Sequence, residues 1–144
     1  MKRWLGVDHG TKRIGLAVTD EAAAIASPLD VIAAEPREAV FRRIAALARE
    51  YDAAGVIVGW PLNTDDTEGP QGRLARRFAC ELLLATGLEV RLWDERFTSS
   101  DADGKLAGLY TRKQKKARHD AVAAAAILIS FLSAGPESCA PRPF

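Results

Sequence analysis

Four acidic residues are the side chains of this 144-residue sequence best placed to do chemistry: Asp8, Asp94, Glu95 and Asp120. The first three follow apolar runs that are predicted to be strands, and Asp120 opens an apolar helix. The carboxyl ends of parallel strands meet at one edge of an open α/β sheet. Carboxylate oxygens there bind hard divalent cations, and two ions roughly 4 Å apart can hold both oxygens of a phosphodiester displacement. The pattern therefore favours a site for one or two divalent cations.

Each acid also has an ordinary structural explanation. Asp8 can cap the turn that follows it, Asp120 can cap its helix, and Glu95 can form an exposed ion pair. Adjacent residues of a strand face opposite sides of the sheet, so the sequence leaves open whether Asp94 or Glu95 is the ligand. The hypothesis of a metal site therefore depends on all of these positions together.

Basic residues accompany the acids at two places. The turn over residues 10–13 offers backbone N–H groups, a hydroxyl and the cations Lys12 and Arg13 to an anion. Residues 104–119 contain six Lys or Arg residues and no acid, although the net charge of the chain is only +1. Such a segment suits contact with a phosphate backbone, and it equally suits a solvated loop.

Length and composition indicate a single globular domain. Hydrophobic residues make up 48% and charged residues 27% of the sequence, which is ordinary for such a domain. Two cysteines are too few for a disulfide framework, and no apolar run is long enough to cross a membrane. We expect a domain over residues 1–134, a disordered tail over residues 135–144, and a cytoplasmic protein without membrane contact.

The order of the predicted elements indicates a mixed α/β sheet. Residues 4–7 and 14–18 form a hairpin with Gly10 and Gly15 at its turn, and residues 27–32 form an edge strand because of Pro28. A strand buried on both faces is predicted at residues 55–58, and an alternating strand at residues 89–93. Helices are predicted from the stripes at Val40, Ile44, Leu47, Tyr51 and at Leu74, Phe78, Leu82, Ala85, from a capping box at residue 98, and over residues 121–132.

Six blocks of the sequence resemble the YqgF (RuvX) family, ribonuclease-H-like nucleases described as Holliday junction resolvases or pre-16S rRNA processing nucleases. The blocks are GVDHGTKRIGLAV (6–18), VGWPLN (58–63), EGP (68–70), RFA (77–79), DERFT (94–98) and DAVAAA (120–125). They occur in the family's order over residues 4–132. The sequence departs from the usual pattern at Trp60, where an aliphatic residue is common, and at Asp66, where glycine is common.

This resemblance implies a ribonuclease-H-like fold, with a five-stranded mixed sheet of order 3-2-1-4-5 flanked by helices. It implies that Asp8, Glu95 and Asp120 form an acidic triad for Mg²⁺ or Mn²⁺, with Asp94 as a substitute ligand. Our hypothesis is a nuclease that activates water between two ions bridged by Asp8. The expected nucleic-acid contacts are Lys12, Arg13, Asn63, Arg96, Arg112, Lys113, Lys115, Lys116 and Arg118.

The resemblance also supplies the expected substrates. The first is structured RNA, the 5′ end of the 16S rRNA precursor, and the alternative is branched DNA, a four-way junction cut by a homodimer with two sites. Composition does not distinguish RNA from DNA. Two other classes stay open: a non-catalytic RNA-binding assembly factor, and an actin-like ATPase, whose phosphate loop resembles the hairpin but whose second domain and second phosphate loop this sequence lacks.

Overall fold

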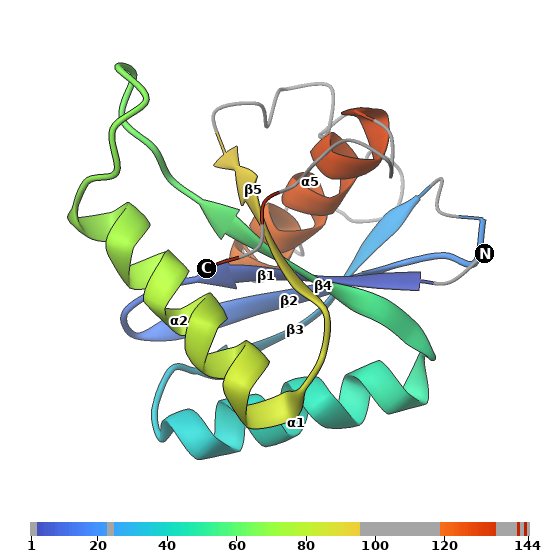
Figure 1. Cartoon of the computed structure of the whole chain (residues 1–144). Coiled ribbons are helices and arrows are strands. Elements are labelled where there is room, and N and C mark those ends of the chain that lie inside the picture. The colour runs from blue at the N-terminus through green and yellow to red at the C-terminus, as the bar shows by residue number, and fades with distance from the viewer. Residues whose placement is uncertain (1–2, 23–24, 96–118, 135–140, 142, 144) are drawn as a thin grey trace.

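A five-stranded mixed sheet forms the centre of the molecule (Figure 1). The computed structural model describes residues 3–22, 25–95, 119–134, 141 and 143. The strand order β3-β2-β1-β4-β5 confirms the expected sheet. The strands are β1 (Arg3–His9), β2 (Arg13–Thr19), β3 (Ala26–Ala33), β4 (Ala53–Trp60) and β5 (Val90–Asp94).

The strand directions bring the candidate acids to one edge. β1 pairs antiparallel with β2 and parallel with β4, and β4 pairs parallel with β5. Strands β1, β4 and β5 therefore end at the same edge of the sheet, as predicted, and Asp8 and Asp94 lie at the ends of their strands. One detail of the predicted hairpin is wrong. Gly15 does not belong to the turn but lies inside β2, opposite Asp8.

Helices cover both faces of the sheet (Figure 1). α1 (Arg37–Glu50) and α2 (Pro70–Thr86) lie on one face, and α5 (His119–Ala134) lies on the other. The stripe predicted for the first helix is buried at Val40, Ile44 and Leu47. The second helix ends at Gly87, which has the predicted left-handed conformation with a φ of 71°.

The predicted apolar stripe of α2 is only half right. Phe78 and Leu82 are buried, but Leu74 is 38% exposed and Ala85 is exposed. Their places towards the sheet are taken by smaller residues, Gly72, Ala75 and Ala79. Small side chains let the helix approach the sheet closely, so the buried seam lies further round the helix than the large apolar residues suggest.

The sheet separates two hydrophobic cores. Leu5 and Val7 of β1 point into the core under α1 and α2, whereas Gly6 faces α5. Successive residues of a strand point to opposite faces, so Asp8 also faces α5. The residues of α5 are apolar on nearly all sides, and most of them are buried, as expected from the sequence.

Some expectations concern residues that the structure does not describe. The helix predicted from residue 98 and the basic segment both lie outside the described residues. Of the predicted tail, only Pro141 and Pro143 are described. The backbone oxygen of Pro141 accepts a hydrogen bond of 2.8 Å from the Leu92 N–H, and that of Pro143 lies 3.5 Å from the Cys80 sulfur. None of the helices in the described ranges is both long and apolar enough to span a membrane.

Candidate active site

Asp8 lies between two glycines of the neighbouring strands. Gly15 of β2 is its antiparallel partner. On the other side, the pairing of Val7 with Val58 makes Gly59 the next residue of β4 beside Asp8. Neither glycine has a side chain, so the sheet surface is bare on both sides of the Asp8 carboxylate. Other groups can therefore approach that carboxylate closely from both sides.

The start of the helix α5 packs against the bare surface at Gly15. A methyl group added to Gly15 would lie 1.9 Å from the backbone oxygen of Asp120 and 2.8 Å from the nitrogen of Ala121. One added to Gly6 would lie 2.8 Å from the backbone oxygen of Ala124. Because real Cβ atoms do not approach other atoms so closely, the first turns of α5 require glycine at both positions. This contact places Asp120 beside the strand position opposite Asp8.

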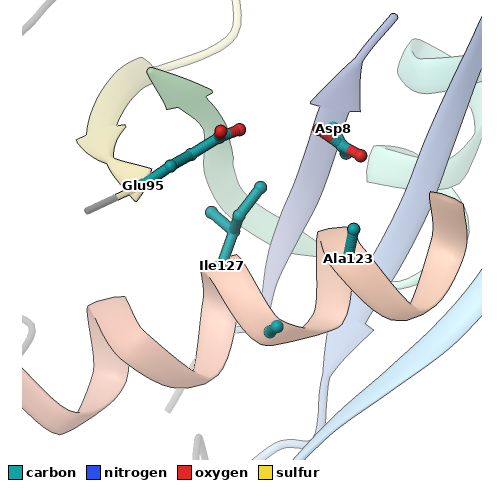
Figure 2. Close-up of a pocket in the computed structure, with 5 residues that line it drawn as sticks. Asp8, Glu95, Ala123 and Ile127 are labelled. Atoms are coloured by element: carbon teal, nitrogen blue, oxygen red, sulfur yellow. The ribbon is translucent and has the colours of Figure 1, made fainter. Parts of the chain in front are cut away.

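The Glu95 side chain lies over the bare surface at Gly59. A methyl group there would lie 2.3 Å from the Oε1 of Glu95 and 2.5 Å from the Cδ1 of Ile127. Asp8 and Glu95 line one pocket of about 340 Å³, with Ala123, Ala126 and Ile127 of α5 as its apolar wall. Figure 2 shows the two carboxylates on opposite sides of this pocket.

The sequence leaves open whether Asp94 or Glu95 is the metal ligand, and Glu95 is the one that lines the pocket. Asp94 ends β5 opposite Trp60 and is not among the residues that line the pocket. Burial, reinforced by the negative charges of Asp8 and Asp94, raises the pKa of Glu95 from its usual 4.5 to about 7. Negative charge is thus concentrated where the carboxylates of Asp8, Asp94 and Glu95 approach one another.

Asp120 is held by a cation of the protein. The Nε of Arg13 donates a hydrogen bond of 3.0 Å to its Oδ2, and the side chains are 71% and 27% exposed, respectively. Asp120 is not among the residues that line the pocket. Within the described part of the chain, no three Asp, Glu, His or Cys side chains are gathered closely enough to hold a metal ion as they stand.

The chemistry of the donor set nevertheless fits a divalent cation. Asp8 and Glu95 present carboxylate oxygens to one pocket, and Asp120 comes from a helix turn adjoining Ala123 of its wall. Oxygen ligands of this kind are those that Mg²⁺ and Mn²⁺ prefer. Burial is the main reason that the pKa of Glu95 is raised, and the added repulsion from Asp8 and Asp94 would be relieved by a positive ion between the carboxylates.

A loop over residues 61–69, the anchored loop, follows β4 at the same edge. The Glu68 carboxylate accepts hydrogen bonds from the Trp60 Nε1 at 2.9 Å and from two nitrogens of Arg76 at 2.8 and 2.9 Å. The Arg76 hydrogen bonds lower the pKa of Glu68. These bonds fasten the base of the loop over residues 61–69 to α2. They also give the unusual Trp60 a structural role.

The tip of this loop is closed by its own hydrogen bonds. The backbone N–H of Asn63 donates to the backbone oxygen of Thr67 at 2.9 Å, and the side-chain Nδ2 of Asn63 donates to the Thr67 hydroxyl at 2.9 Å. Asp66 has a φ of 70°. That left-handed conformation favours glycine, and aspartate is one of the few other residues that adopt it readily.

The structure therefore describes only some of the predicted nucleic-acid contacts. Lys12 is exposed in the turn after β1, Arg13 pairs with Asp120, and Asn63 is exposed in the anchored loop. The remaining predicted contacts lie outside the described residues: Arg96, Arg112, Lys113, Lys115, Lys116 and Arg118. Sequence reasoning missed the importance of Gly15 and Gly59. The signal available was an isolated glycine within each strand, which indicates a close backbone approach.

The sheet order and the flanking helices define a ribonuclease-H-like α/β fold, which is also the fold of RuvC. The fold is similar to that of Thermus thermophilus RuvC in complex with a Holliday junction substrate, with a TM-score of 0.59 and 14% identity over 92% of this chain and 93% of that one. It is also similar to the fowlpox virus Holliday junction resolvase, with a TM-score of 0.52 and 13% identity over 92% and 99% of the two chains.

The sequence comparison identifies the family within this class. The profile of the RuvX family, described as Holliday junction resolvase, matches residues 2–134, so this chain belongs to the RuvX family. A protein of Anaeromyxobacter sp. (strain Fw109-5) named "Putative pre-16S rRNA nuclease" is 44% identical over 131 residues, covering 90% of this chain and 96% of its own length. One of Geobacillus kaustophilus (strain HTA426) with the same name is 39% identical over 133 residues, with the same coverage.

The two glycines beside Asp8 should respond differently to alanine. We predict that Gly15→Ala costs about 1–3 kcal/mol in urea unfolding, because its methyl group meets the rigid backbone of α5. The methyl group of Gly59→Ala would contact the ends of two side chains that can rotate. The loss in the free energy of unfolding should therefore stay below about 1 kcal/mol. The Gly59 variant should nevertheless bind Mn²⁺ more weakly, since Glu95 must move. Equal stability losses for the two variants would contradict this account of the site.

The raised pKa of Glu95 predicts a pH-dependent stability in the absence of divalent ions. The folded protein holds a proton on Glu95 up to about pH 7, whereas the unfolded chain releases it near 4.5, so this contribution to stability is lost as the pH rises between those values. With EDTA, Glu95→Gln should therefore melt several degrees higher than the wild type at pH 8, and at the same temperature as the wild type at pH 4.5. A variant that melts lower at pH 8 would show that ionised Glu95 is stabilised.

Proposed function

We propose that this protein is a divalent-metal-dependent nuclease that hydrolyses phosphodiester bonds in structured nucleic acid. The observation that carries the proposal is the row Gly15, Asp8 and Gly59, with the backbone of Asp120 packed over Gly15 and the carboxylate of Glu95 over Gly59, on either side of Asp8. The carboxylates of Asp8 and Glu95 share one pocket at the edge where the parallel strands end, and Asp120 begins the helix that forms the wall of this pocket. The names of the RuvX family and of its curated members agree with nucleic-acid hydrolysis.

Each residue of the site has a defined task in this proposal. Asp8, Glu95 and Asp120 would hold Mg²⁺ or Mn²⁺, and two bound ions would supply an activated water and charge neutralisation of the phosphodiester. Asp8 is fixed on the central strand and would be the shared ligand. Glu95 must lose its proton to serve as a ligand. The wall formed by Ala123, Ala126 and Ile127 shields one side of the pocket from water.

The basic residues would hold the substrate rather than the metal. Lys12 and Arg13 lie in the turn and strand beside Asp8 and can neutralise phosphate. Arg96 would likewise hold or neutralise phosphate, and the basic residues over positions 112–118 would contact the backbone without reading sequence. Asn63, in the anchored loop, would contact nucleotides outside the pocket. Contacts of these kinds favour a folded nucleic acid that reaches several surfaces at once.

The substrate we favour is the 5′ end of the 16S rRNA precursor, which would place the protein in the cytoplasm during ribosome biogenesis. The names of the curated relatives, which align over nearly their full length, support this choice. The family description supports one alternative, the cleavage of four-way DNA junctions in recombination. That activity would require a homodimer, because the two cuts in a junction need two sites related by a two-fold axis.

A cleavage assay with matched variants tests this proposal. Wild-type protein should cut a labelled precursor of the 16S rRNA 5′ end in Mg²⁺ or Mn²⁺, and should not cut it in EDTA. Asp8→Asn and Glu95→Gln should each lower the rate by at least about 100-fold, because each removes a charged ligand from the metal. Asp94→Asn is the control: it removes the neighbouring carboxylate that lies outside the pocket, and it should retain most activity.

The pattern of failure separates the alternative functions. Metal-dependent cleavage of a four-way junction but not of the rRNA precursor would select the resolvase. Binding of the RNA without cleavage under every metal condition would favour the non-catalytic assembly factor. Cleavage that survives in Asp8→Asn with the metal still required would contradict the proposed site.

A further inference from the structure

The ion pair between Arg13 and Asp120 is the starting point for a further inference, which rests on the proposed metal site. The Nε of Arg13 lies 3.0 Å from the Oδ2 of Asp120. Arg13 immediately precedes the buried part of β2, and Gly15, two residues later, supports the backbone of Asp120. The same short segment therefore fixes both the backbone of Asp120 and the charge partner of its carboxylate.

The pairing engages only one edge of the guanidinium. Among the described residues, the carboxylate of Asp120 is the only one that pairs with Arg13. The Arg13 side chain is 71% exposed, whereas that of Asp120 is 27% exposed. The cation can thus swing into solvent, while the acid is held at the start of its helix.

We propose that Arg13 is a stand-in cation for the divalent ion at Asp120. In the metal-free protein, its guanidinium neutralises the one acid of the triad that does not line the pocket. When an ion binds Asp8 and Glu95 and recruits Asp120, the ion displaces Arg13 from this carboxylate. The released guanidinium then becomes available to a substrate phosphate.

The magnitudes allow this exchange. An ion pair as exposed as this one contributes little net free energy, because solvent screens it and both side chains lose freedom. A divalent ion on carboxylate oxygens interacts far more strongly, and it repels a guanidinium on the same carboxylate. Arg13 therefore competes with the ion but cannot prevent it from binding.

A different role for Arg13 would change the metal affinity in the opposite direction when the residue is replaced. If the guanidinium instead held Asp120 in the geometry that the ion needs, its removal would weaken metal binding. The exchange predicts that its removal strengthens metal binding. The sign of the change in affinity therefore decides between a competitor and a positioning residue.

The experiment measures Mn²⁺ binding to the intact protein without nucleic acid, through the electron paramagnetic resonance signal of free Mn²⁺. Arg13→Gln should bind Mn²⁺ about two- to five-fold more tightly than the wild type, the range expected for losing an exposed ion pair. Lys12→Gln is the matched control: it removes an adjacent exposed cation, for which no side-chain partner is described, and should change the affinity by less. In the Asp120→Asn background, Arg13→Gln should have no further effect.

Each outcome decides the question. Tighter binding in Arg13→Gln that exceeds the control and disappears with Asp120→Asn supports the exchange. Unchanged or weaker binding in Arg13→Gln, with normal binding in the wild type, overturns the exchange and leaves the proposed nuclease standing. No Mn²⁺ binding by the wild type, at concentrations that support cleavage in other nucleases of this chemistry, overturns the metal site and the exchange together.

Discussion

The close approach of α5 to the sheet is the constraint on which the rest of the site depends. The helix rests on the glycine positions of β1 and β2, where an added methyl group would collide with its backbone. An alanine-rich helix suits this contact, because its small side chains keep the distance short. This packing turns the start of α5 into a fixed wall beside Asp8. A loosely packed helix would leave Asp120 without a defined position.

The site concentrates negative charge, and the protein limits the cost by two different means. Glu95 is half-buried near Asp8, and its raised pKa allows it to be neutralised by a proton. Asp120 is neutralised by Arg13. Both arrangements can be reversed by a bound cation, whereas a buried structural ion pair would resist it. The anchored loop differs in this respect: Glu68 is bound by Arg76 and Trp60 at once, as expected for a carboxylate with a structural task.

Much of the fold could be predicted from the sequence because it depends on local patterns. The stripe on α1, the glycine that ends α2, and the strand order implied by the family resemblance are all confirmed. The predicted stripe of α2 is wrong at Leu74 and Ala85, because the size of an apolar residue does not show which side of the helix faces the sheet. Ala75 and Ala79 are buried in their place. Periodicity identifies a helix better than it identifies which residues touch the sheet.

The candidate site was less predictable, since its geometry depends on register and on close contacts. Asp94 ends β5 and Glu95 follows it, and which of the two side chains points towards Asp8 cannot be read from their residue types. The structure places Glu95 in the pocket over Gly59. The pairing of Arg13 with Asp120, 107 residues apart, has no local signal at all. Long-range contacts of this kind follow only from the packing of α5.

The most direct test of the metal site is a crystal structure of the protein soaked with Mn²⁺ at pH 8, where Glu95 is largely ionised. The account predicts an anomalous scattering peak in the pocket, within about 2.2 Å of carboxylate oxygens of Asp8, Glu95 and Asp120. It also predicts that the guanidinium of Arg13 has left its contact with Asp120. A fully occupied Mn²⁺ elsewhere in the molecule, with Asp8 and Glu95 unliganded, would contradict it.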